Sequence, residues 1–225
     1  MKDNSPLSHT VNVEFDGGSA KFNLDKVTGV EGMWWKLCMG RGITNAKPRF
    51  NSDGNDYAID ENQPHDNNMY GFIFVPYDNG QYSIHTNWAK AENLIGFTNS
   101  SLGAYQAAAG AYQVAQNADT AYDLEMATPS FSNVGDMELL TIMAKAEGIG
   151  DGINDFLDET TVFASWAQSK TKPNEASKSD IGGGMTEGGM LGSTDSETGT
   201  SIWIGANFPA VFTDDGRIGL EWNKG

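Results

Sequence analysis

The sequence predicts an all-β fold, an antiparallel meander with long polar loops and one short helix inside a loop. Apolar and polar residues alternate over several segments, as in strands with one apolar and one polar side. Glycine-containing turn signals such as Asp78-Asn79-Gly80 separate some of these segments. A length of 225 residues is enough for one large β domain, and we take residues 1–225 as a single β region.

The first third of the chain predicts one hairpin and one further strand. His9–Phe15 and Ala20–Leu24 alternate on either side of Asp16-Gly17-Gly18, which predicts a tight turn at the two glycines. Met33–Ile43 alternates again and predicts a third strand. Asn45–Asn68 is polar and without periodicity, which predicts a loop.

Met69–Phe97 predicts a second hairpin that turns at Asp78-Asn79-Gly80. An Asn-Gly pair tolerates positive φ at both residues, as the tightest hairpin turns require. After the turn, Tyr82, Ile84, Thr86 and Trp88 fall on one face, so we expect this face to be apolar.

The connection at about 99–131 contains the alanine-rich run Leu102–Gln116, which predicts a short helix. The connection at about 173–200 is a low-complexity polar loop. Four further strands are predicted from alternation, at Asp136–Glu147, Thr161–Lys170, Ser201–Phe208 and Arg217–Asn223.

Composition excludes several classes of function. A net charge of -16 opposes binding to a nucleic-acid backbone, which needs a basic face. The single cysteine, Cys38, excludes an internal disulfide and lies in an apolar run, which predicts a buried, inert thiol. The three histidines lack zinc-site spacing, and no G-x-S-x-G motif occurs, so we predict neither a catalytic site nor an enzyme.

Acidic loop residues are the only metal candidates. Asp53 and Asn55 lie in one loop and Asp151 and Asp155 in another, and Ca²⁺ prefers such closely spaced oxygen ligands. Neither stretch has the glycine and glutamate positions of an EF-hand, so solvated turn residues are the favoured interpretation and no cofactor is predicted.

The connections appear in two lengths. Short turns are predicted around Gly17, Gly80 and Gly216, and long polar connections at Asn45–Asn68, Asn99–Phe131 and Pro173–Thr200. Outer-membrane barrels have short turns at one end and long loops at the other. With a turn at Gly17, however, the first long loop falls at the wrong end, which a further strand at Ala46–Phe50 would correct. No apolar run is long enough for a transmembrane helix.

The polar faces of the predicted strands carry charges of both signs, which a water-filled lumen tolerates better than a soluble core does. We therefore expect part of a transmembrane β-barrel. Soluble β-sandwiches also alternate, so a soluble or surface-exposed sandwich that binds glycan or a partner protein is the alternative. The pore-lining candidates are Glu14, Lys21, His85, Lys145, Glu147, Arg217 and Glu221.

Several segments resemble an uncharacterised family of porin-like outer-membrane proteins from campylobacterial and related Gram-negative bacteria. The resemblance covers nearly the whole chain, through HTVNVEFDG (9–17), NLDKVT (23–28), GRGITNAKPRF (40–50), GFIFVPYDNGQYSIHTN (71–87), NLIGFT (93–98), GIGDGINDFLDET (148–160), FASWAQSKT (163–171) and DGRIGLEWNKG (215–225). The family has no established substrate, and its members are longer at both ends. The resemblance therefore implies an internal fragment, an outer-membrane location and a barrel architecture.

These expectations combine into one functional hypothesis. We expect passive, porin-like diffusion of small solutes or ions, with a mild cation preference from the acidic loops. The expected partners are outer-membrane lipid and lipopolysaccharide on the outside of the barrel and small solutes within it, with no nucleic acid.

Overall fold

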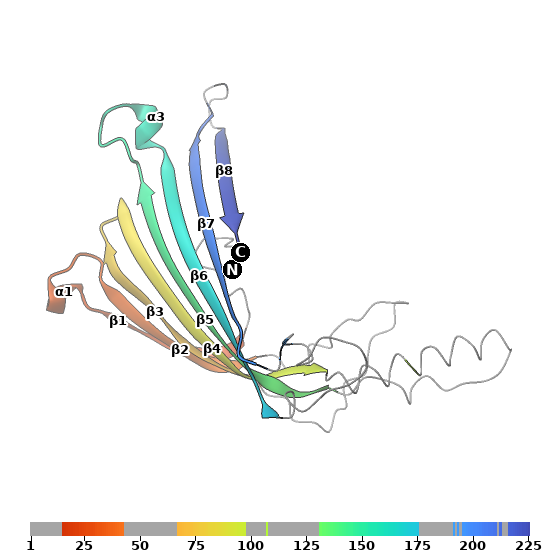
Figure 1. The fold of residues 1–225 in the computed structure, drawn as a ribbon. Coiled ribbons are helices and arrows are strands. Elements are labelled where there is room, and N and C mark those ends of the chain that lie inside the picture. Colours follow the sequence, from red (N-terminus) through yellow and green to blue (C-terminus); the bar gives the residue numbers. More distant parts are fainter. Residues whose placement is uncertain are drawn as a thin grey trace.

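The computed structural model of the chain describes residues 15–42, 67–97, 107, 131–175, 191, 193, 195–210, 212 and 216–225. Its elements are β1 (Phe15–Asn23), α1 (Asp25–Thr28), β2 (Trp34–Gly42), β3 (Asn68–Asp78), β4 (Tyr82–Phe97), β5 (Phe131–Glu147), α3 (Asp155–Asp158), β6 (Thr161–Pro173), β7 (Thr198–Pro209) and β8 (Arg217–Lys224). Each strand pairs antiparallel with the next in sequence, which gives one eight-stranded meander (Figure 1). The predicted all-β antiparallel meander is therefore confirmed.

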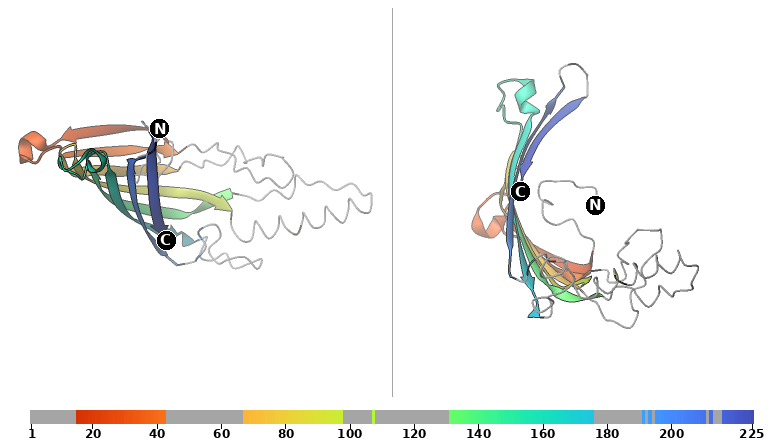
Figure 2. Two further views of the ribbon diagram at one scale, coloured as in Figure 1. Left: turned by 90° about the horizontal axis from the view of Figure 1, so that it is seen from above. Right: turned by 45° about the vertical axis from the view of Figure 1, so that its right-hand side comes forward.

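The sheet is curved and open. Figure 2 shows its curvature, and β1 and β8 form its two edges without pairing with each other. The described strands therefore form a single sheet that does not close into a barrel. No helix within the described ranges has the length and apolarity needed to cross a bilayer.

The meander separates the connections into two groups at opposite ends of the sheet. Connections 24–33, 79–81, 148–160 and 210–216 have 3 to 13 residues and leave from the end where Figure 1 shows α1 and α3. Connections 43–67, 98–130 and 174–197 have 24 to 33 residues and leave from the other end. The asymmetry of short and long connections expected from the sequence is thus present.

The predicted turn at Gly17-Gly18 is wrong, because both glycines lie within the continuous strand β1. Gly17 pairs with Gly40 of β2, and a Cβ atom at Gly17 would lie 2.2 Å from the carbonyl oxygen of Met39. The glycine thus permits a close approach of two backbones rather than a turn. Because β1 continues through these glycines, all three long connections leave from the same end of the sheet. The further strand expected at Ala46–Phe50 is therefore not needed to place them there, and residues 46–50 lie outside the described residues.

The predicted hairpin between β3 and β4 is confirmed, but its turn differs in detail. Gly80 and Gln81 form the loop, and of the Asn-Gly pair only Gly80 has positive φ, at 86°. The Oδ1 atom of Asn79 accepts hydrogen bonds from the backbone N–H groups of Gln81 (3.1 Å) and Tyr82 (2.7 Å). Asn79 therefore stabilises the turn through its side chain rather than by a left-handed backbone.

The remaining strands are confirmed with shifted limits. β5 begins five residues before the predicted start at Asp136, β6 continues to Pro173, and β7 begins at Thr198. The predicted helix Leu102–Gln116 lies, apart from Ala107, outside the described residues, and so does most of the strand His9–Phe15.

Hydrogen bonds join the short connections to one another. The backbone N–H of Asp78 donates to the carbonyl of Glu31 (3.1 Å), and the Nε2 atom of Gln81 donates to the carbonyl of Gly148 (2.7 Å). Three successive short connections are therefore held together at this end of the sheet.

The two neighbouring glycines of β1 provide a matched test of the close approach. Gly17→Ala forces a Cβ atom against the backbone of β2, whereas a Cβ atom at Gly18 meets nothing within 4 Å. We expect Gly17→Ala to lower the free energy of unfolding by about 1–3 kcal/mol. Gly18→Ala, the control, should change it by less than about 0.5 kcal/mol. Urea unfolding followed by tryptophan fluorescence measures both, and equal losses would restore the turn interpretation.

Candidate functional site

The two faces of the sheet differ in exposure. On β5, Ile142 is 42% exposed, whereas Thr141 and Met143 on the opposite side are 0% and 5% exposed. Side chains converge on the concave side of a curved sheet and spread apart on its convex side. We therefore assign Thr141 and Met143 to the concave side, named the inner face, and Ile142 to the convex side, named the outer face (Figure 2). Alternation and pairing register assign the other strand residues.

The outer face carries a continuous apolar surface, which we name the apolar belt. Aromatic rings contact one another across β1 to β4, with centroid distances of 6.3 Å for Phe22–Trp35, 6.3 Å for Trp35–Phe72 and 5.7 Å for Phe72–Trp88. Eight of its fourteen side chains are 37–61% exposed, and the other six are partly buried. The belt comprises Phe22, Trp35, Leu37, Phe72, Phe74, Ile84, Trp88, Leu140, Ile142, Trp166, Ile202, Ile204, Leu220 and Trp222.

The belt ends at a polar border on the side of the long connections. On the outer face, the first polar residues beyond the belt, from β1 to β8, are Asp16, Arg41, Asn68, Lys90, Glu138, Gln168, Thr200 and Lys224. All eight strands therefore change from apolar to polar on the same face.

This border runs obliquely to the strands. Pairing register puts Asp16 level with Lys172 of β6 but Lys224 level with Trp166, six residues away on the same strand. With about 3.3 Å per residue and about 4.8 Å between strands, the strands are tilted by roughly 30° from the perpendicular to the border of the belt.

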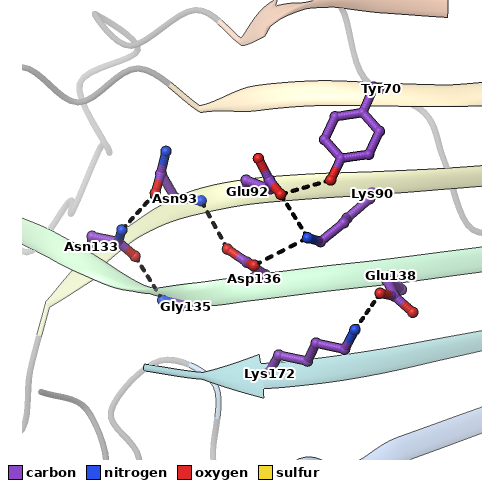
Figure 3. Close-up of polar contacts among 9 residues, drawn as sticks. All are labelled: Tyr70, Lys90, Glu92, Asn93, Asn133, Gly135, Asp136, Glu138 and Lys172. Carbon is purple, nitrogen blue, oxygen red and sulfur yellow. Dashed lines mark hydrogen bonds and ion pairs between the residues drawn. The ribbon is translucent and has the colours of Figure 1, made fainter. Parts of the chain in front are cut away.

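A charged network lies at this border and joins β3, β4 and β5 (Figure 3). The hydroxyl of Tyr70 and the ammonium of Lys90 both donate to Oε1 of Glu92, each at 2.6 Å. Lys90 also lies 3.5 Å from a carboxylate oxygen of Asp136. The hydrogen bond to Glu92, with Tyr70 alongside, raises the pKa of Lys90, and the bond from Lys90 lowers the pKa of Glu92.

The network occupies a corner of the sheet. The pairing of β3 with β4 stops at Glu92, and the pairing of β6 with β5 stops at Gly135. Beyond these residues β4 and β5 pair only with each other. Asn93 and Gly135 have positive φ here (58° and 143°), and the register of β4 and β5 shifts. The backbone N–H of Asn93 donates to Asp136 (3.1 Å), so the network also fixes the bulge.

The least exposed residues of the inner face include both apolar and hydroxyl-bearing side chains. Among the apolar ones, Val75, Ala167 and Met143 are 0%, 1% and 5% exposed. Thr141, Ser165 and Ser83 are 0%, 2% and 6% exposed, and each carries a hydroxyl group. Within the described ranges, the Oγ atom of Ser83 and the Nδ1 atom of His85 have no hydrogen-bond partner. The sheet therefore buries hydroxyl groups on its inner face, while its outer face leaves large apolar side chains exposed.

Six of the seven predicted pore-lining residues lie on the inner face, and Glu14 lies outside the described residues. They are spread over β1, β4, β5 and β8 rather than gathered at one point: Lys21, His85, Lys145, Glu147, Arg217 and Glu221. Lys145 forms an ion pair with Glu147. Arg217 donates to the side chain of Asn207 and to the carbonyl of Glu159, so it joins β8 to the connection before β6.

The Ca²⁺ candidates receive no additional ligands. Asp151 accepts a hydrogen bond from Gln81, and Asp155 lies in the first turn of α3. No group of three or more His, Cys, Asp or Glu side chains suited to a metal occurs within the described ranges. Asp53 and Asn55 lie outside those ranges.

Sequence reasoning did not select two features. Lys36 lies on the inner face opposite Lys21, and its alternation with Trp34 and Cys38 is the signal that could have identified it. The Tyr70–Glu92–Lys90–Asp136 network leaves no local signal, because its members come from three strands.

The ion pair between Glu138 and Lys172 provides a pH test of the border. The hydrogen bond from Lys172 lowers the pKa of Glu138 below its ordinary value of 4.5, so the pair stabilises the fold above that pH. A double-mutant cycle with Glu138→Gln and Lys172→Gln should give a coupling energy of up to about 1 kcal/mol at pH 7. The coupling should vanish as the pH falls below the lowered pKa; coupling unchanged at pH 2.5 would contradict this assignment. Urea unfolding of the four proteins measures it.

Comparison with known proteins gives a family but no activity. No curated protein and no solved structure matches the chain. A family model described as "Protein of unknown function (DUF3373)" matches residues 1–225. Since the match covers every residue, the chain belongs to the DUF3373 family, an uncharacterised family as expected from the resemblance.

Proposed function

We propose that this chain forms part of a Gram-negative outer-membrane β-barrel through which small solutes or ions diffuse passively, as in a porin. The apolar belt carries the proposal. Eight of its fourteen side chains remain 37–61% exposed on the convex face, while the hydroxyl groups of Thr141, Ser165 and Ser83 are buried on the concave face. A sheet that is apolar outside and polar inside fits a lipid exterior and an aqueous interior.

Lipid removes the energetic cost of the exposed belt. Burial of a large apolar side chain contributes about 1.5–3 kcal/mol, so a belt left in water forgoes this amount at many positions. A soluble sandwich recovers it by packing a second sheet on the apolar face. The described strands form only one sheet, which favours lipid as the covering phase.

The tilt of the strands relative to the belt also supports the proposal. The inclination of roughly 30° approaches the 35–45° typical of transmembrane barrels. On this proposal the spanning part of each strand is the belt, and the charged border lies in the headgroup region. Closure requires strands that pair with β1 and β8, from the same chain or from another copy.

The charges suggest how the pore would select solutes. The eight strands contain nine Lys and Arg against seven Asp and Glu, so they are almost neutral. Connections 43–67, 98–130 and 174–197 contain 13 Asp and Glu against three Lys and Arg. The short connections at the opposite end contain eight Asp and Glu against one Lys, so the acidic excess is ten at the end of the long connections and seven at the other. Acidic residues at both mouths, with the larger excess in the long connections, raise the local concentration of cations, which gives a mild cation preference without any catalytic chemistry.

The native cysteine tests the lipid and water faces directly. Cys38, which the sequence predicted to be buried, is only partly buried and lies on the inner face, and Leu37, its neighbour, lies in the belt. In outer-membrane vesicles containing the full-length protein, a charged, membrane-impermeant methanethiosulfonate should modify Cys38 at least tenfold faster than the cysteine of Cys38→Ser/Leu37→Cys. In urea the two rates should become equal, which controls for local reactivity. Equal rates in the vesicles, or a protein soluble without detergent, would contradict the barrel.

Ion selectivity tests the role of the acidic connections. In planar bilayers with a KCl gradient, the reversal potential should give a K⁺/Cl⁻ permeability ratio above 1. Neutralising one long connection with five amide substitutions should lower that ratio at least twofold; they are Glu175→Gln, Asp180→Asn, Glu187→Gln, Asp195→Asn and Glu197→Gln. The control neutralises Asp151, Asp155, Asp158 and Glu159 at the opposite end and should change the ratio less. An anion-selective wild type would refute the preference.

A further inference from the structure

We propose that Lys21 and Lys36 form an anion-binding site on the inner face for a small oxyanion with two or more oxygens, such as a phosphate or a carboxylate. The inference deepens the proposed function, on which it rests, because it names a solute class that the lumen would recognise. Its basis is a pair of unneutralised ammonium groups on neighbouring strands.

The pairing register puts the two lysines directly opposite each other. Lys21 of β1 pairs with Lys36 of β2, so both side chains leave the sheet on the same face, with Cβ atoms about 4.5–5.5 Å apart. Two ammonium groups at this spacing can both donate to one oxyanion. Like charges placed directly opposite destabilise a sheet, so the pair costs stability unless an anion offsets it.

Other lysines of the strands contrast with this pair. Lys90, Lys145 and Lys172 each have a carboxylate within ion-pair distance. Among the described residues, neither Lys21 nor Lys36 has one. The contact of Lys21 is with the ring of Trp34, whose centroid lies 4.1 Å from its Nζ atom. This cation–π contact holds the ammonium group in position without neutralising its charge.

The neighbouring inner-face positions suit an anion. Ser19 and Cys38 form the next pair on one side, and Asn23 and Trp34 the next pair on the other, which adds a hydroxyl and an amide as donors. On β3, Lys36 faces Ile73, and the nearest inner-face carboxylate along that strand is Asp78, about 15 Å further on. No described acidic side chain therefore competes for the pair.

Cys38 lies on the same face two residues from Lys36 and serves as a native reporter. We would compare the modification of Cys38 by an anionic reagent (sulfonatoethyl methanethiosulfonate) and a cationic one (trimethylammonioethyl methanethiosulfonate), in the full-length protein in vesicles. We would divide the rate with the anionic reagent by the rate with the cationic reagent. This ratio should be at least fivefold higher for Cys38 than for a free thiol in solution. Inorganic phosphate at millimolar concentration should remove this excess, whereas chloride at equal ionic strength should not.

The lysine variants identify the source of the effect. Lys21→Gln/Lys36→Gln should abolish both the excess and the phosphate effect, and Lys21→Arg/Lys36→Arg should keep them. Lys26→Gln, an exposed charge change in α1, is the matched control and should behave like wild type. Because the phosphate titration uses the wild type, the proposal can be tested even if the double variant fails to fold.

The outcomes separate this proposal from the pore itself. If Cys38 reacts with both reagents at the free-thiol ratio and phosphate changes nothing, the anion site is overturned while the water-lined inner face stands. An excess that survives Lys21→Gln/Lys36→Gln also overturns the site. If neither reagent reaches Cys38, the inner face is not lined by water, and the proposed function fails together with the site.

Discussion

The pairing register from β1 to β8 is the constraint on which both faces of the sheet depend. Side chains alternate with a period of two, so a slip of one residue in any pair would exchange the faces of every strand beyond it. The bulges preserve this order: after the irregularity between Phe74 and Tyr77, Tyr77 pairs with Ile84 and both remain on the outer face. The belt is continuous because the register keeps the same parity across seven pairings.

Charge follows the same division. At the border of the belt, Lys90 forms ion pairs with Glu92 and Asp136, and Lys172 forms one with Glu138, which limits the cost of charges beside an apolar surface. On the inner face Lys21 and Lys36 have no such partner within the part of the chain that the structure describes. The sheet therefore has an apolar band, a polar border joined by ion pairs and, on its other face, two lysines that no described carboxylate pairs with.

Alternation made most of the strands and both faces predictable, because a strand with two different environments repeats every second residue. It was misleading at Gly17, since a glycine pair is as compatible with close backbone approach as with a turn. At Asn79-Gly80 the turn was correctly located, but which residue has positive φ depends on side-chain hydrogen bonds that a dipeptide pattern does not specify. The Tyr70–Glu92–Lys90–Asp136 network could not be predicted from the sequence, because its members become neighbours only when β3, β4 and β5 pair.

The sequence by itself determined which side chains share a face, that the acidic residues concentrate in the connections, and that short and long connections differ. These are properties of local order along one strand or one loop. Only the tertiary structure decided that the apolar face is convex and exposed, that its border crosses the strands obliquely, and that Lys21 lies opposite Lys36. Each of these depends on the relative offset of neighbouring strands, which is set by hydrogen bonding between segments and leaves no mark within any single segment.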